Sequence, residues 1–135
     1  MSYLKIRELL EQHLNSNAGG VAVAFENVPY SPVRGTPFQR ASLIPAKTEN
    51  PTVGAGFKRE RGIFQVSLYY PLNAGAQPAT TRAEALLAAY KRGTTFVDGT
   101  LRILIHESPF VSSSLIQEAW FMLPVSVPYV ADIFG

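Results

Sequence analysis

Two histidines and one run of serines are the side chains in this sequence whose types suit nucleophilic or acid–base chemistry. His13 lies on the apolar side of an amphipathic N-terminal segment, and His106 lies next to Glu107 on an expected strand. Histidines in such places are more often structural or surface residues than catalysts. The serines at 112–114 lie in an expected loop, and no histidine and aspartate partners can be predicted around them. These residues predict a protein that is not an enzyme.

Metal, cofactor and thiol chemistry also lack their usual residue patterns. The sequence has no HExxH motif, no histidines four residues apart and no carboxylates at calcium-loop spacing. Residues 53–58 resemble a phosphate-binding loop only faintly, because the Gly-Lys-Ser/Thr ending is missing and Arg59 stands where a dinucleotide fingerprint needs a glycine. The chain has no cysteine, which excludes disulfides and thiolate metal sites. We therefore expect no metal and no cofactor.

A basic and aromatic cluster carries the clearest chemical preference. Lys58, Arg59 and Arg61 flank Phe57 on an expected loop, and together they could contact a phosphate backbone. Glu60 balances part of this charge, so a solvated loop without a ligand explains the same residues. The formal net charge of the chain is only +2, which is weak support for nucleic acid as a partner.

The composition predicts a single folded domain, residues 1–135, that meets other subunits. Hydrophobic residues make up 47% of the chain, which is enough apolar surface to offset the entropy lost on ordering. Charged residues make up only 16%, and the centres of protein interfaces are similarly poor in charge. Neither a signal peptide nor a continuous apolar stretch of membrane-spanning length is recognisable. We expect an intracellular protein with no membrane partner.

Two segments have the periodicity of amphipathic helices. The first runs from an expected N-cap at Ser2 to a stop in residues 15–20, which are rich in asparagine and glycine. In the second, Thr81 and Glu84 have capping-box spacing, and Gly93 ends the helix. The apolar stripe of this second helix contains Ala83, Leu86, Leu87 and Tyr90.

The remaining regular pattern is that of β-strands. The clearest strand spans residues 62–70, where Phe64, Val66 and Leu68 share one face. Shorter or weaker strands are expected from Val21 to the turn at Pro29 and at 38–45, 95–97, 101–107 and 119–127. Residues 46–62 read as a long polar loop or loose hairpin. We expect its part from 47 to 61 to be mobile in the isolated subunit and ordered on assembly.

This order of elements indicates an α+β fold. Two helices separated by runs of strands do not match the strict alternation of a doubly wound sheet. We expect a mostly antiparallel sheet of four to six strands with the two helices packed on one face. The inner face of the strand at 62–70 is then expected to pack against the stripe of the second helix.

Four segments, taken in order, resemble the tail-terminator-like minor tail proteins of long-tailed phages and prophages. Residues 21–30 are similar to the opening strand of that family with its Glu-Asn-x-Pro-aromatic turn, here Glu26, Asn27, Pro29 and Tyr30. Residues 35–38, followed by Arg40 and Ala41, are similar to the entry of its second strand. Residues 61–68 and 124–129 resemble its central and closing strands. The segment between Gly93 and Trp120 matches only loosely, so no contacts are carried over to it.

The resemblance implies a structural virion protein without an active site. Members of that family form a ring, a homo-hexamer, that caps the tail tube, ends its polymerisation and prepares the tail for head joining. The implied partners are other copies of the chain, the tail tube protein and the head–tail connector protein. The implied location is the virion tail, assembled in the host cytoplasm. Lys58, Arg59 and Arg61 are then expected to line the ring lumen or an axial face, in transient non-specific contact with passing DNA.

Three other functions remain open at the level of sequence. A neck or head–tail connector subunit of the same particle shares the composition and the habit of forming rings. A nucleic-acid-binding module predicts salt-sensitive DNA affinity carried by Lys58, Arg59 and Arg61. A small enzyme predicts a deep polar pocket with perturbed acids.

Overall fold

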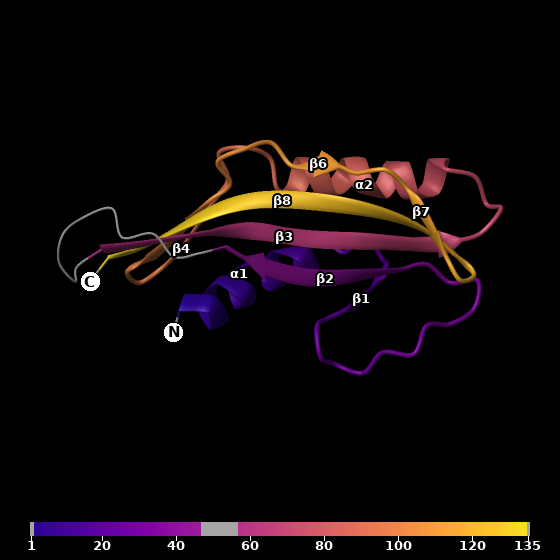
Figure 1. Cartoon of the computed structure of the whole chain (residues 1–135), viewed down its shortest axis with the longest axis horizontal. Coiled ribbons are helices and arrows are strands. Elements are labelled where there is room, and N and C mark those ends of the chain that lie inside the picture. The colour runs from indigo at the N-terminus through magenta and orange to yellow at the C-terminus, as the bar shows by residue number, and fades with distance from the viewer. Residues whose placement is uncertain (1, 47–56, 135) are drawn as a thin grey trace.

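The structure is a computed structural model that describes residues 2–46 and 57–134. Two helices, α1 (Ser2–Ser16) and α2 (Gln77–Ala89), accompany one sheet (Figure 1). The strands are, in chain order, β1 (Ala22–Ala24), β2 (Phe38–Pro45), β3 (Phe57–Pro71), β4 (Thr95–Asp98), β5 (Leu101–Leu104), β6 (Phe110–Val111), β7 (Leu115–Gln117) and β8 (Trp120–Phe134).

The sheet is larger than the sequence predicts and is mixed. In the described part of the chain it has eight strands: six follow the order β1-β2-β3-β8-β5-β4, and β6 and β7 also pair with β8. β1 runs parallel to β2, whereas the other pairings are antiparallel. The α+β class is confirmed, but the expectation of a mostly antiparallel sheet of four to six strands was wrong. β6 and β7 are too short to show an alternating pattern, and β1 reaches its parallel partner through a loop rather than a hairpin.

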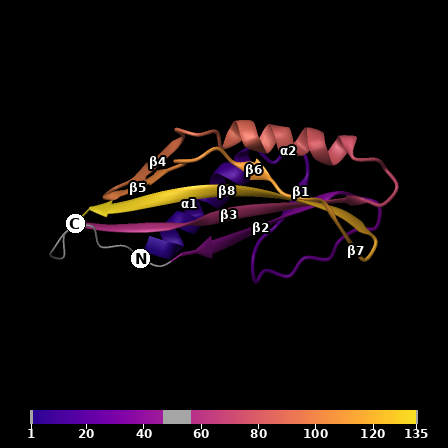
Figure 2. The same ribbon diagram turned by 45° about the horizontal axis from the view of Figure 1, so that its top comes forward.

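Both helices contribute to a single core on the inner face of the curled sheet (Figure 2). Tyr90, the C-cap residue of α2, packs between the sheet and α1: its ring centroid is 5.7 Å from that of Phe64 on β3, and its hydroxyl donates to the Leu10 carbonyl of α1 at 2.7 Å. The predicted packing of the central strand against the stripe of α2 is therefore confirmed. The fully buried aliphatic side chains of this core include Ile6, Leu10, Leu14, Val66, Leu68, Leu86, Ile103 and Ile105.

The central pair of strands, β3 and β8, is longer at one end than the sequence predicts. Its register runs over fifteen residues of each strand, from Phe57↔Phe134 to Pro71↔Trp120. The loop expected as far as residue 61 is therefore strand from Phe57 onward, while residues 47–56 lie outside the described part of the chain. β8 likewise continues to Phe134 through Pro128, which pairs with Ile63.

Gly62 occupies a position in β3 where any larger residue would collide with its neighbours. A β-carbon placed on it would lie 2.6 Å from the backbone oxygen of Ile44 and 2.6 Å from the hydroxyl of Tyr129. Glycine inside a strand weakens it unless another group needs the space, and here the fully buried Tyr129 ring fills that space. Close packing against Tyr129 and the Ile44 backbone thus explains why glycine stands at position 62, in the segment that resembles the family's central strand.

Helix α2 begins one turn earlier than the capping pattern predicts. It starts at Gln77, with Pro78 in its first turn, and the N-cap residue Ala76 makes no side-chain capping bond. Thr81 and Glu84 therefore lie inside the helix, and the predicted capping box was wrong. Proline is favoured in the first turn because that position lacks a helical partner for its N–H.

A buried polar cluster ties α2 to the connection between α1 and β1. Arg82 is only 8% exposed, and its guanidinium donates to the Asn17 carbonyl at 2.6 Å and to the side-chain oxygen of Gln39 at 3.1 Å. Gln39, fully buried on β2, donates in turn to the carbonyls of Ala18 and Val21 at 3.1 Å. Burial lowers the pKa of Arg82. The connection between α1 and β1 is thus held by hydrogen bonds from buried side chains, because it lies outside the paired strands of the sheet.

Candidate functional site

The three basic residues singled out in the sequence lie at the start of β3, on a strand rather than a loop. Side chains alternate between the faces of a strand, so Lys58 faces the opposite side from Arg59 and Arg61. Arg59 pairs with Asp132, its register partner on β8, with Nε 2.8 Å from Oδ1. The structure therefore does not bring the three cations together as one patch.

The contacts that Lys58, Arg59 and Arg61 make within the chain determine which of them can bind a ligand. Arg59 is held by Asp132, and its side chain is 34% exposed. Arg61 is half-buried and also engaged in a polar interaction, whereas Lys58 is exposed. Lys58 is consequently the best placed of the three to contact another molecule.

The two histidines have structural surroundings. Nε2 of His13 lies 2.7 Å from the Ala89 carbonyl, and its ring packs edge-on against Tyr90 and Phe96. His106 lies 3.8 Å from the Glu107 carboxylate. Within residues 2–46 and 57–134, no group of three or more metal-ligating side chains comes together. Neither helix in these residues has the length and apolar character that would span a membrane.

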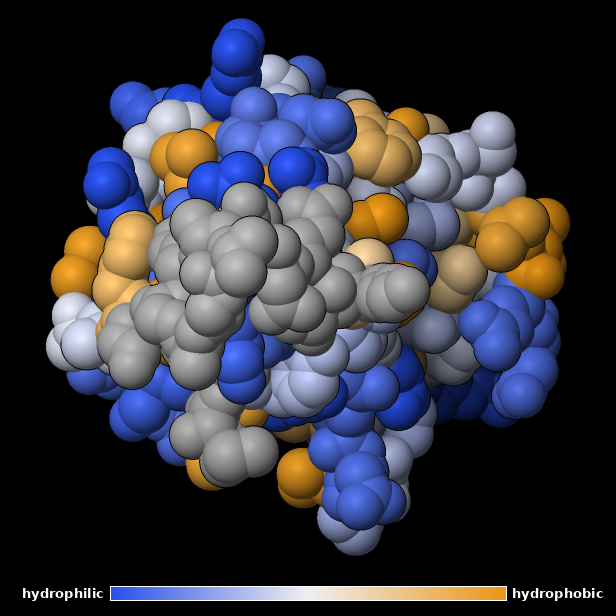
Figure 3. Space-filling model, turned by 60° about the vertical axis from the view of Figure 1, so that its left-hand side comes forward, coloured by the Kyte–Doolittle hydropathy of each residue, from blue (hydrophilic) through white to orange (hydrophobic). Residues whose placement is uncertain are grey.

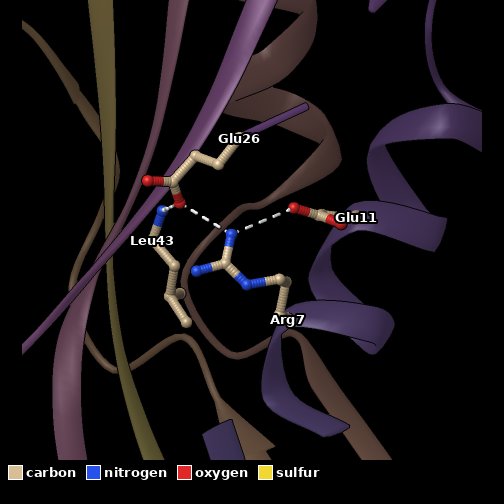
Figure 4. A network of polar contacts seen from close by, with 4 residues as sticks. All are labelled: Arg7, Glu11, Glu26 and Leu43. Atoms are coloured by element: carbon tan, nitrogen blue, oxygen red, sulfur yellow. Dashed lines mark hydrogen bonds and ion pairs between the residues drawn. The ribbon is translucent and has the colours of Figure 1, made fainter. Parts of the chain in front are cut away.

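The turn that resembles the family's Glu-Asn-x-Pro-aromatic motif closes an open sheet edge. β1 covers only the first residues of β2, and beyond it the carboxylate of Glu26 accepts the backbone N–H of Leu43 at 2.8 Å. Arg7 of α1 reaches the same carboxylate oxygen at 2.6 Å and Glu11 at 3.5 Å (Figure 4). Asn27 adopts the left-handed conformation, φ 57°, that asparagine tolerates better than most residues. The motif is structural: it ends β1 and caps β2.

This network predicts how the stability of the protein changes in acid. Burial would raise the pKa of Glu26, but the hydrogen bond from Leu43 and the contact with Arg7 outweigh it and lower the pKa below its usual 4.5. Glu26 therefore stabilises the fold above about pH 4.5, and this contribution is lost as the pH falls through the lowered value. Glu11 acts in the opposite sense, because burial raises its pKa despite Arg7.

We expect Glu26→Gln to flatten the acid side of the stability curve, measured by urea unfolding between about pH 3 and 7. Glu26→Ala should in addition cost about 1 kcal/mol at neutral pH, because the Leu43 N–H loses its acceptor. Glu8→Gln, on the same helix as Arg7 but outside this network, is the matched control. Identical pH profiles for the wild type and Glu26→Gln would show that the network does not set acid stability.

A cleft lined by aromatic and arginine side chains lies at the other end of β3 and β8. The rings of Phe38 and Tyr69 stack with centroids 4.5 Å apart, and Trp120 meets Phe38 edge-on at 5.1 Å. The guanidinium of Arg40 lies over both stacked rings, 5.8 Å and 5.9 Å from their centroids. Tyr30 covers Phe38 from the loop before β2. We call this group, with the two cavities beside it, the aromatic cleft.

The two cavities adjoin at Trp120 and give the aromatic cleft room for a ligand. One holds about 340 Å³ and reaches Gln117 and Glu118 at the tip of the β7–β8 hairpin. The other holds about 310 Å³ and reaches Arg34 and Asn73. The lining is mixed: aromatic faces, two arginines and one carboxylate. Such a lining suits a ligand that combines an apolar or aromatic group with a negative charge.

Sequence reasoning missed the aromatic cleft because its residues come from four separate segments. Phe38 and Arg40 belong to β2, Tyr69 to β3, Trp120 to β8 and Tyr30 to a loop. The only signal available was the richness in aromatic residues, which a core would explain equally well. Arg40 did fall within a segment that resembles the family, but that resemblance assigns it no role.

Exposed apolar side chains mark further surfaces that other subunits could cover. They are found on the first turn of α1, in the loop between β1 and β2, on the short strands and near the ends of β2 and β8: Tyr3, Leu4, Val28, Val33, Ile44, Val97, Phe110, Val111, Leu115, Ile116 and Phe134 are at least 39% exposed. Seen from the end where β3 begins and β8 finishes, such residues lie among hydrophilic ones rather than in one broad patch (Figure 3). Contacts with partners would then involve several small, separate groups of apolar side chains.

Comparison with known proteins places the chain in a family. A family model described as phage tail terminator protein matches residues 5–129. A solved structure superposes with a TM-score of 0.81 at 23% sequence identity, covering 100% of this chain and 99% of its own, which shows a shared fold. No curated protein matches the chain. The family match spans most of the chain, including α2, most of α1 and the aromatic cleft: the chain belongs to the phage tail terminator protein family.

Proposed function

We propose that the protein forms a ring that caps the phage tail tube, ends tube polymerisation and prepares the tail for head joining. The observation that carries this proposal is the family match over residues 5–129. A phage tail structural protein located in the virion tail follows from the family itself. The ring, its six copies and its place at the end of the tube are the proposed part.

The geometry of the subunit is compatible with such a role. A closed ring needs two different, complementary faces on every subunit. The described residues offer short edge strands with exposed apolar side chains at β4, β6 and β7, and the aromatic cleft at one end. The proposed partners are other copies of the chain, the tail tube protein on one axial face and the head–tail connector protein on the other.

We also propose that the start of β3 faces the lumen or an axial side of this ring. Lys58, Arg59 and Arg61 would then contribute positive charge repeated around the ring, in transient contact with passing DNA. Lys58 is the residue to test, since it is exposed and Arg59 is held by Asp132. Changing Arg59 to Glu would place two carboxylates opposite each other on β3 and β8 and disturb the fold.

The experiment is deletion of the gene in the phage that carries it, with tail length measured by electron microscopy. We expect tails longer than normal and without heads, because nothing stops tube growth. Complementation with the wild-type gene should restore tail length. Lys58→Glu should restore length as well, while lowering the efficiency of head joining or DNA delivery.

Tails of normal length in the deletion strain would overturn the terminator role and assign the protein to the neck, as a connector subunit. A Lys58→Glu phage with wild-type infectivity would leave the terminator role intact but remove the proposed role of the basic residues. Thr80→Glu, at a position on α2 that is also exposed, is the matched control for adding a negative charge.

A further inference from the structure

We propose that the aromatic cleft binds residues 107–111 of a second copy of this chain, with Phe110 entering the cleft and Glu107 pairing with Arg40. This inference rests on the proposed ring and names the contact that would join its subunits. It places the aromatic cleft at one end of a subunit against strand β6 of the next.

The aromatic cleft has the charge and the faces for such a segment. Among the residues that the structure describes, neither Arg34 nor Arg40 has a carboxylate within ion-pair distance. Arg40 lies over aromatic rings instead, which leaves its N–H groups available at the edge of the cleft. Tyr69 and Trp120 are half-buried, so each still presents part of a ring.

Residues 107–111 have the complementary chemistry on an exposed segment. Phe110 is 48% exposed and Val111 39% exposed, although both belong to strand β6. The Glu107 side chain is 62% exposed, and its ion-pair contact among the described residues is the distant one to His106 at 3.8 Å. A carboxylate, Pro109 and an exposed phenylalanine in one short segment match a cleft of aromatic faces and arginines.

The segment cannot reach the cleft of its own chain. β6 is fixed to the middle of β8 by the pairing of Phe110 with Ser126, whereas the cleft residue Tyr69 pairs with Met122 (Figure 1). The separation along β8 is four residues, or roughly 13 Å at 3.3 Å per residue. A contact between the two must therefore be made between molecules. Because the two surfaces differ, the contact is of the head-to-tail kind that builds rings.

Nucleic acid suits the aromatic cleft less well than a peptide segment. Aromatic rings and arginines also bind single strands, but Glu118 lines the same cavity and would repel phosphates. A peptide carries its negative charge at one side chain, which can pair with Arg40, whereas a nucleic-acid strand would bring a phosphate at every nucleotide. Binding of an oligonucleotide in the cleft is consequently an outcome that the test must be able to report.

The test uses disulfide trapping, which is clean here because the chain has no cysteine of its own. One variant carries Ser108→Cys, which lies in the 107–111 segment and keeps Phe110. A second carries Gln117→Cys, which lies at the cavity of the aromatic cleft. The two are mixed at millimolar concentration under mild oxidation, and mixed dimers are counted by mass spectrometry. The matched control pairs Ser108→Cys with Ala88→Cys, an exposed position on α2. All three positions are exposed, and thermal melting confirms that the variants fold.

We expect the pair at 108 and 117 to give about tenfold more mixed dimer than the control pair, a typical effect for a specific contact around one anchor residue, here Phe110. Arg40→Glu in the 117 variant should reduce the yield to the control level. Glu107→Arg in the 108 variant should then restore it, because the charges are exchanged. Yields equal to the control, or a yield indifferent to the charge of residue 40, would overturn the proposal.

A single-stranded oligonucleotide added to the mixture addresses the remaining possibility. Suppression of the trapped dimer, together with oligonucleotide binding that Arg40→Glu abolishes, would assign the cleft to nucleic acid and overturn the proposal. The tail-length experiment is independent of these results. If the deletion strain makes overlong tails but no mixed dimer is trapped, the terminator role is kept and this interface is rejected. If the mixed dimer is trapped but tails have normal length, the interface is kept and the terminator role is rejected.

Discussion

Val66→Asp is expected to unfold the protein, with a loss of more than about 4 kcal/mol in the free energy of unfolding. Val66 is fully buried on β3 and belongs to the core beneath both helices. A carboxylate there would have no hydrogen-bond donor or cation among its apolar neighbours, and an unpaired buried charge is strongly unfavourable. Circular dichroism during thermal melting measures the effect.

The neighbouring residue provides the control for this substitution. Gln65 lies on the opposite, half-buried face of the same strand, so Gln65→Asp should keep a cooperative transition. If Val66→Asp were soluble and melted cooperatively near the wild-type temperature, the inner face of β3 would be wrongly assigned. The same substitution on two adjacent residues therefore tests which face of the sheet carries the core.

The second large effect is expected at Arg82, where Arg82→Met should cost about 3 kcal/mol of stability. The substitution keeps much of the apolar stem but removes the donors that serve the Asn17 carbonyl and the Gln39 side chain. The side-chain oxygen of Gln39, which is fully buried, is then left without these donors. Arg92→Met, at an exposed position after α2, should change stability by less than about 0.5 kcal/mol.

A double-mutant cycle with Gln39→Leu separates the shared part of this loss. Arg82 and Gln39 contact each other directly, so their effects should not add, and a coupling of about 1–2 kcal/mol is expected. Urea unfolding of the four proteins gives the coupling energy. Fully additive effects would mean that the arginine stabilises α2 on its own rather than holding the connection between α1 and β1.

The core of this fold could be predicted because its signal is local. Phe64, Val66 and Leu68 alternate on one strand, and Leu86 and Tyr90 recur at helical spacing, so each pattern is visible in a short window of sequence. The hairpin around Asp98 and Gly99 was also predictable: β4 and β5 flank a turn in which Gly99 has φ 60°. In these places local preference and tertiary packing agree.

The extension of β3 could not be predicted because its residues carry no apolar alternation. Between Lys58 and Arg61 the strand is charged on both faces, and it is held by its long pairing with β8 and by the pair of Arg59 with Asp132. That partner lies 73 residues away in sequence. A pattern limited to neighbouring residues therefore reads the same letters as a solvated loop.

The start of α2 shows a competition between two valid signals. Thr81 and Glu84 have the spacing of a capping box, but Pro78 three residues earlier can begin a helix as well. The earlier start buries Ala79 and Arg82, and Arg82 is the residue that reaches Gln39 across the core. Tertiary contacts decide between the two starts, and these are invisible in the local sequence.

The continuous ladder between β3 and β8 also has a mechanical meaning. Fifteen paired residues form a beam of about 50 Å, with the start of β3 at one end and the aromatic cleft at the other. A force along this beam loads its hydrogen bonds side by side in shear, so they must yield together rather than one after another. A displacement at the start of β3 would therefore be transmitted to the aromatic cleft with little deformation of the strands. In the proposed ring, strain could then pass from subunit to subunit without refolding any of them.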